Sequence, residues 1–70
     1  MADVTMPMNG KVIAVKVQVG QAVSEDDEVV IIEAMKMELP IVTPVGGTVK
    51  EIKAKEGDSY QVGAVLVVVG

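Results

Sequence analysis

A motif that occurs twice in the 70-residue sequence restricts its fold more than any other feature. When the sequence is aligned with itself at an offset of 37 residues, identical residues coincide and many others match in kind. The identical pairs include Gly10 with Gly47, Val12 with Val49, Lys16 with Lys53, and Gly20 with Gly57. The two copies extend over roughly residues 8–32 and 45–69 of a single predicted domain, residues 1–70. Because two copies are too few for a stacked solenoid, we expect two similar halves related by a pseudo-twofold axis.

Spacing within each copy indicates strands that carry a β-bulge. Same-face residues of a regular strand lie two apart, but the apolar Val12 and Val15 lie three apart, and Val49 and Ile52 repeat this spacing. One extra residue in a strand forms a bulge, which bends the strand and increases its twist. Each copy then turns at a glycine and resumes as an apolar strand, at residues 29–32 and 65–69. Two halves of four short strands predict a sandwich or a flattened β-barrel.

The composition supports a β fold whose stability comes from apolar burial. Half of the residues are hydrophobic, valine dominates, and Tyr60 is the only aromatic residue. Branched side chains such as valine pack well on pleated surfaces. The chain has no cysteine for a disulfide and no histidine for a structural metal, so an efficient apolar core is needed in a domain this short.

Charge and hydropathy exclude several classes of partner. The net charge of −4 argues against nucleic acid, because phosphate binding needs clustered basic residues. Apolar runs are a few residues long, far too short for a membrane span. The absence of cysteine fits a reducing compartment, and no targeting segment is recognisable, so we expect a cytoplasmic protein. The mitochondrial matrix or the chloroplast is the alternative if the sequence comes from a larger eukaryotic chain.

The segment between the copies, residues 32–39, has conflicting signals. Its Glu, Ala, Met, Lys and Leu residues favour a short helix by propensity alone. A hairpin with Met35 and Lys36 as a two-residue turn instead sorts the flanking residues into two faces. One face carries Val30, Ile32, Ala34, Met37, Leu39 and Ile41, and the other carries Val29, Ile31, Glu33, Glu38, Pro40 and Val42. We therefore expect a hairpin with Lys36 at its tip, held away from the core.

Two features of this hairpin are unfavourable for a purely structural turn. A tight two-residue turn places non-glycine residues at positive φ, and Glu33 and Glu38 face each other across the strands. Local conflicts of this kind often mark functional positions. A lone lysine between two glutamates is, however, also an ordinary solvated surface group, and the residues alone leave both interpretations open.

The segment Glu33-Ala34-Met35-Lys36-Met37 resembles the attachment motif of biotin-dependent carboxylases. The resemblance to this biotinyl/lipoyl attachment family covers nearly the whole chain, including residues 6–10 and the glycine turns at residues 19–23 and 56–60. It implies an all-β fold, a flattened β-barrel or sandwich of two four-stranded antiparallel sheets. It also implies that Lys36 lies on a hairpin tip at the end opposite the chain termini.

The resemblance further implies a biotin carboxyl carrier rather than an enzyme. A biotin protein ligase would biotinylate Lys36, and the tethered biotin would carry a carboxyl group from a biotin carboxylase site to a carboxyltransferase site. Glu33, Ala34, Met35 and Met37 would form the motif that the ligase recognises. We expect Met35 to be an exposed recognition contact and Met37 to pack on the apolar face. The isolated domain is expected to be monomeric and to hold no metal.

Two alternatives and one departure from the family pattern accompany this prediction. A lipoyl carrier, or one that accepts both groups, has the same fold, and a cofactor-free interaction module is a third reading. The family often has a glycine near position 26, where this chain has Asp26, and the counterpart in the second copy is Gly63. The acidic run at residues 25–28 is expected to be a solvated loop, since it lacks the spacing of a calcium loop.

Overall fold

The computed structural model describes all residues, 1–70, as eight strands joined by turns. The domain is elongated, with extents of 31 × 18 × 18 Å. No helix in it is long and apolar enough to cross a membrane. The strands are β1 (Ala2–Thr5), β2 (Gly10–Val15), β3 (Ala22–Val23), β4 (Glu28–Ala34), β5 (Met37–Val42), β6 (Gly47–Ile52), β7 (Ser59–Tyr60) and β8 (Val65–Val69).

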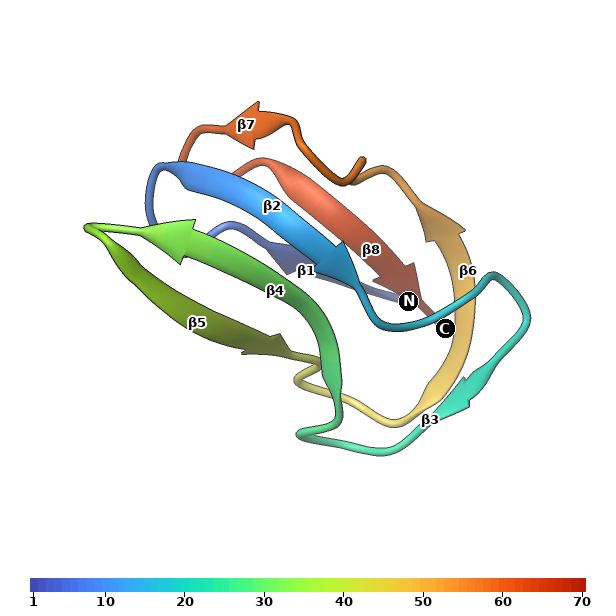
Figure 1. Cartoon of the computed structure of the whole chain (residues 1–70). Helices are drawn as coiled ribbons and strands as arrows, with labels where there is room; N and C mark the ends of the chain where they lie inside the picture. Colours follow the sequence, from blue (N-terminus) through green and yellow to red (C-terminus); the bar gives the residue numbers. More distant parts are fainter.

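The strands form two four-stranded antiparallel sheets, which confirms the predicted fold class. The strand order is β1-β8-β6-β3 in one sheet and β5-β4-β2-β7 in the other (Figure 1). If β1 to β4 are exchanged with β5 to β8, the first sheet order becomes the second. The pseudo-twofold symmetry predicted from the repeat therefore extends to every strand and to the pairing of the sheets.

The bulge predicted from the valine spacing is present in both halves. The register of β2 against β4 shifts between Val12 and Ala14, and the register of β6 against β8 shifts between Val49 and Glu51. These positions are equivalent under the repeat. Both bulges bend their strands, as one extra residue does, and this curvature lets the two sheets enclose one core.

A second pair of bulges was not predicted, and it corrects the expected position of Val29. The β4–β5 register shifts between Glu28 and Val30, so Val29 is the extra residue. The β1–β8 register shifts at the equivalent place, where Leu66 is the extra residue. Both side chains are fully buried. Strict alternation predicted Val29 on the outer face, which is wrong, because the bulge allows two consecutive residues to point into the core.

The core is a single cluster of 15 buried hydrophobic residues contributed by both halves. Val4, Val12, Val30, Ile32, Leu66 and Val67 are among them. Thr43 is the only buried polar residue, and its hydroxyl donates to the Val45 carbonyl oxygen at 2.7 Å. Apolar burial thus dominates the interior, as the composition required.

The loop at Asp26 keeps the conformation of its glycine counterpart. Asp26 has a φ of 72°, close to the 89° of Gly63. The Asp26 N–H donates to the Thr43 carbonyl, and the Gly63 N–H donates to the Met6 carbonyl, which is the equivalent bond. The departure from the family pattern therefore leaves the loop shape unchanged and places a non-glycine residue in the left-handed region.

Candidate functional site

The segment between the copies forms the predicted hairpin, not a helix. Strands β4 and β5 pair with Ala34 opposite Met37 and Glu33 opposite Glu38, which is the register expected from the hydrophobic pattern. Met35 and Lys36 form the two-residue turn, with φ values of 53° and 64°. Positive φ at both central residues is the signature of a type I′ turn, whose twist matches that of paired strands. The pairing of the flanking apolar residues has overridden the helix propensity of the turn.

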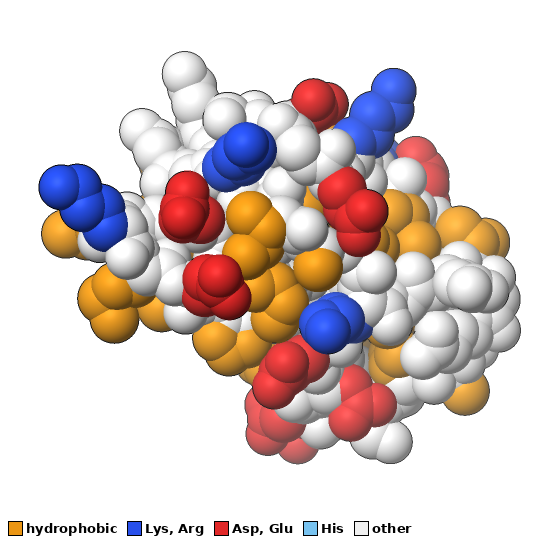
Figure 2. All heavy atoms as spheres, in the orientation of Figure 1, with side chains coloured by type: hydrophobic (Ala, Val, Ile, Leu, Met, Phe, Trp, Pro, Cys, Tyr) orange, Lys and Arg blue, Asp and Glu red, His pale blue; other side chains and the backbone are white.

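Lys36 projects from one end of the molecule. Its side chain is exposed, and it makes no ion pair, since the only salt bridge joins Lys53 to Glu51. The β4–β5 turn lies at the end opposite the two chain termini (Figure 1). In the space-filling view, a basic side chain extends beyond the surface at this end (Figure 2). The primary amine is thus accessible to another protein without any rearrangement of the fold.

The two methionines beside Lys36 are both exposed. Met35 is 85% exposed, as expected for a recognition contact in the turn. Met37 is 62% exposed, so the prediction that it packs on the apolar face is wrong. Ala34, directly opposite, is the last buried residue of β4, and the hydrophobic core ends at that rung. Met37 lies on the inward face of the hairpin but beyond the core that would cover it.

Charged residues form one row across the outer face at the base of the tip. Lys11 on β2 lies opposite Glu33 on β4, and Glu33 lies opposite Glu38 on β5. All three side chains are exposed. Lys11 lies next to Glu33 only and forms no salt bridge with it, and the repulsion between the two glutamates is weak at exposed positions. The motif residue Glu33 is therefore available to a partner.

Gly10 supports the base of the hairpin, and the sequence identified it only as a repeat position. A Cβ atom at Gly10 would lie 2.7 Å from the Glu33 carbonyl oxygen and 3.2 Å from the Ala34 Cβ. Real Cβ atoms do not approach a backbone oxygen so closely, so only glycine permits this packing of β2 on β4. The absence of a side chain at Gly10 lets β2 pack directly against Glu33 and Ala34, the two residues that precede the turn.

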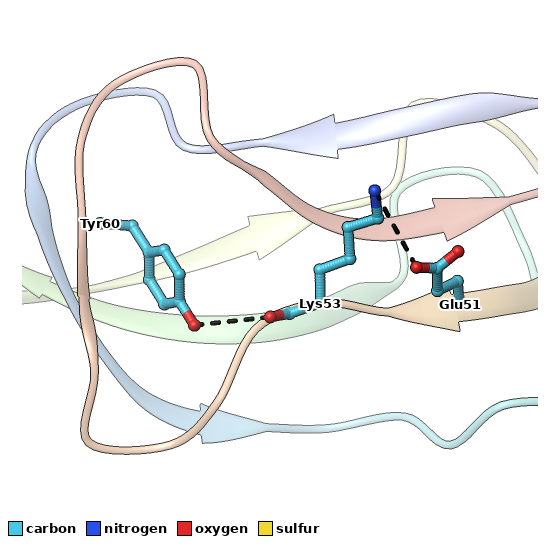
Figure 3. A network of polar contacts seen from close by, with 3 residues as sticks. All are labelled: Glu51, Lys53 and Tyr60. Carbon is cyan, nitrogen blue, oxygen red and sulfur yellow. Dashed lines mark hydrogen bonds and ion pairs between the residues drawn. The ribbon is translucent and has the colours of Figure 1, made fainter.

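Tyr60 and Asn9 fix the loops next to this base. Tyr60 pairs with Gly10, and its hydroxyl accepts a bond from the Lys55 N–H at 3.0 Å. The same hydroxyl donates to the Lys53 carbonyl at 3.4 Å, which is the bond drawn in Figure 3. The Asn9 side-chain oxygen accepts a bond from the Val62 N–H at 2.8 Å. Neither side chain was predicted to have a role, although Tyr60 stands out in the sequence as the only aromatic residue.

An open groove of about 560 Å³ lies beside the hairpin, between its base and β7. It is lined by Asn9, Gly10, Lys11, Glu33, Ala34, Met35, Ser59, Tyr60 and Gln61. None of these residues forms a nucleophile–base pair, and the chain has no group of three or more residues able to hold a metal. What the site offers is an exposed primary amine on a hairpin whose base is closely packed.

Comparison with known proteins gives consistent matches over the whole fold. Residues 2–69 match the Biotin_lipoyl family, described as "Biotin-requiring enzyme". The chain is 45% identical over 64 residues to the biotin/lipoyl attachment protein of Bacillus subtilis, covering 91% of this chain and 88% of that protein. It is 41% identical over 63 residues to the biotin carboxyl carrier protein of Streptococcus mutans, covering 90% of this chain and 48% of that protein.

A solved structure gives the same fold in a much larger enzyme. The urea carboxylase of Kluyveromyces lactis matches with a TM-score of 0.93 and 30% sequence identity. The match covers 99% of this chain and 6% of that enzyme. The chain therefore corresponds to nearly the whole of the Bacillus relative, about half of the carrier protein, and one small domain of the carboxylase.

Proposed function

The chain belongs to the Biotin_lipoyl family, and on this premise we propose that Lys36 is the residue that carries the covalently attached biotin. The observation that carries the proposal is the position of Lys36 at the tip of a type I′ turn, exposed and free of ion pairs. The motif residues Glu33, Ala34, Met35 and Met37 surround it. Of these, Glu33, Met35 and Met37 are exposed and available for recognition, whereas Ala34 is buried under the tip.

The domain is a carrier and not an enzyme, as the carrier and attachment relatives are. Its contribution to catalysis is to hold a mobile arm on a rigid base. Attachment forms an amide between the Lys36 amine and the biotin carboxyl group. ATP activates the carboxyl group as an adenylate with release of pyrophosphate, and the amine then displaces AMP, which takes the carboxyl oxygen with it, as the nitrogen loses a proton. A primary amine is needed for this bond. Because the ammonium becomes a neutral amide, the net charge changes from −4 to −5.

We assign three partners to this tip. A biotin protein ligase attaches the biotin, a biotin carboxylase domain adds the carboxyl group, and a carboxyltransferase domain removes it. The carboxyl carrier protein and the urea carboxylase among the similar proteins support the last two. The exposed tip can present the lysine to the ligase and the attached biotin to the other two active sites, because the core and the termini lie behind it. The isolated domain is proposed to be monomeric.

Intact mass spectrometry tests the attachment directly. The protein is incubated with biotin, ATP and a biotin protein ligase, and the product is mapped by peptide mass. We expect a gain equal to biotin minus one water on the peptide that contains Lys36. Lys36→Arg is the matched control, since arginine keeps the charge but offers no amine for acylation. A gain on another lysine, or on the Lys36→Arg variant, would contradict the assignment.

Lipoate is the second candidate, because the Bacillus relative is named a biotin/lipoyl attachment protein. The same tip presents the same amine to a lipoate ligase, and the two exposed methionines are the features that favour biotin. Incubation with lipoate, ATP and a lipoate ligase separates the readings. A lipoyl gain on Lys36 without a biotinyl gain would replace the first proposal, and failure of both reactions would favour a cofactor-free interaction module.

A further inference from the structure

Apolar side chains also lie on the outside of the sheet that carries Lys36. On β4 and β5, the buried Val30, Ile32 and Ile41 point inward, so the intervening residues point outward. We define the outer apolar face as Ile13, Ala14, Ile31, Pro40 and Val42. None of them belongs to the core cluster or is packed against it, and Val42 is 40% exposed. Hydrophobic atoms gather at the middle of this side of the molecule (Figure 2).

The other half of the molecule shows that the fold does not require four of these five residues to be apolar, the exception being Ile31, whose counterpart is Val68. The repeat places Lys50, Glu51, Asp3 and Thr5 where the outer apolar face has Ile13, Ala14, Pro40 and Val42. The strands, sheet order and bulges are equivalent in the two halves. The second sheet thus folds with polar and charged residues at these positions. An apolar patch that stability does not demand marks an interaction surface.

Acidic residues flank the outer apolar face. Glu28 is paired with Val42 at one end, and Glu33 and Glu38 are paired with each other at the end towards the tip. All three are exposed, and acidic side chains border the apolar atoms in the space-filling view (Figure 2). Lys11 is the one basic residue in these rows. A complementary partner surface has an apolar centre with lysine or arginine residues around it.

The outer apolar face lies close to Lys36 along the hairpin, and this proximity indicates which partner binds it. Ile31 and Pro40 form the rung two positions before the pair Glu33–Glu38, on the same face as that pair. The enzyme that acylates Lys36 must bring the lysine amine itself into its active site, so its surface must come close to the hairpin. A carboxylase meets this domain after the arm has been attached, and the arm lets it act with the hairpin further away.

We propose that the outer apolar face is the docking surface of the biotin protein ligase, which would extend the recognised area well beyond the Glu33–Met37 motif. This rests on the proposed function, since it assumes that Lys36 is biotinylated. Docking through this face sets the outer side of the β4–β5 hairpin against the ligase, with Lys36 at the active site. The charged row at the base of the tip then lies at the rim of the interface.

The repeat supplies a matched pair of variants for the test. Ile31 and Val68 are equivalent residues on the central strands β4 and β8, and both are half-buried on the outer face of their sheet. Ile31→Thr alters the proposed surface, and Val68→Thr makes the same kind of change on the other sheet. Steady-state kinetics of biotinylation are measured for both with biotin, ATP and ligase, after equilibrium unfolding has shown that both are folded.

We expect Ile31→Thr to raise KM for the carrier by about tenfold, as loss of one central interface residue does, with kcat nearly unchanged. Val68→Thr should stay within about twofold of the original protein, since it leaves the interface intact. The double variant Pro40→Asp, Val42→Thr copies the residues of the other half, so it is compatible with the fold, and it should raise KM further.

Three results would overturn the proposal. Equal kinetics for Ile31→Thr and Val68→Thr, with the original protein biotinylated normally, would remove the docking surface and leave the proposed function standing. Normal biotinylation of Ile31→Thr with impaired carboxylation of its biotinyl form would assign the face to the carboxylase instead. Failure of the original protein to accept biotin would overturn the proposed function and the ligase surface together.

Discussion

The turn that presents Lys36 stores conformational strain, and replacing it with a relaxed turn should stabilise the domain. Met35 and Lys36 both have positive φ, at 53° and 64°. The left-handed conformation costs an ordinary L-residue about 1–2 kcal/mol. Asparagine tolerates this conformation and glycine adopts it freely, so Asn-Gly is the preferred sequence for a type I′ turn. The variant Met35→Asn, Lys36→Gly keeps the turn and relieves most of the strain.

The expected gain follows from two opposing contributions. Relief of strain at two positions is worth about 2 kcal/mol or somewhat more. Glycine also gives the unfolded chain more freedom, which offsets about 0.4–1 kcal/mol. Because Met35 and Lys36 are exposed and Lys36 makes no ion pair, no packing is lost. The net stabilisation is about 1–2 kcal/mol, which raises the midpoint of thermal unfolding by roughly 5–15 °C in a domain of this size.

Urea and thermal unfolding of the unmodified protein measure this gain. Lys36→Arg is the control, because arginine has the same backbone preference as lysine, and its stability should stay within about 0.5 kcal/mol of the original. The stabilised variant loses the amine and should accept no biotin. If Asn-Gly leaves stability unchanged or lowers it, the turn is not strained, and the argument that function maintains an unfavourable conformation at this tip is refuted.

Three further variants test the support of the tip and of the core. Gly10→Ala should destabilise the domain by about 1–3 kcal/mol in urea unfolding, because the new Cβ would lie 2.7 Å from the Glu33 carbonyl oxygen. Gly46→Ala is the control and should cost less, since its nearest contact would be at 3.4 Å. Equal losses of stability would contradict the close packing at Gly10. Thr43→Val removes a buried hydroxyl that donates to the Val45 carbonyl and accepts from the Val45 N–H. The free energy of unfolding in urea should fall by about 1–2 kcal/mol. Tyr60→Phe removes two hydrogen bonds to backbone and should cost about 0.5–1.5 kcal/mol without changing the far-UV circular dichroism; an unchanged midpoint would show that water replaces the hydroxyl.

Much of the fold was predictable because the internal repeat is evident in the sequence. The offset between Gly10 and Gly47 predicts two equivalent halves, and the three-residue spacing from Val12 to Val15 predicts the bulge that both halves contain. The hairpin register was predictable because only one alignment of β4 and β5 keeps the apolar residues on one face. Lys36 at the tip follows from that register alone, and its chemical role from the motif around it.

The features that the sequence did not predict depend on tertiary structure, such as the position of a bulge in a strand and the point at which the core ends. Val29 is buried because a second bulge disturbs the alternation of β4, and a run of consecutive apolar residues contains no sign of which one is extra. Met37 has the face predicted for it but lies beyond the end of the core, and periodicity specifies a face without specifying how far the core extends. Gly10 contacts a strand remote in sequence, so its steric role is visible only in three dimensions.

The symmetry of the fold also explains why one end of the molecule differs from the other. The pair β8–β1 is the equivalent of β4–β5, with Ala2 opposite Val69 where Leu39 lies opposite Ile32. A turn joins β4 to β5, but β1 opens the fold and β8 closes it, so no turn joins that pair. The tight turn therefore joins β4 to β5 only, and its two residues, Met35 and Lys36, both have positive φ. The second half forms the same arrangement of strands without such a tip, so the fold does not require the tip to have this sequence. The tip can therefore be shaped by the partners that bind it. The outer faces of the two sheets differ in the same way, since only the face beside the tip is largely apolar.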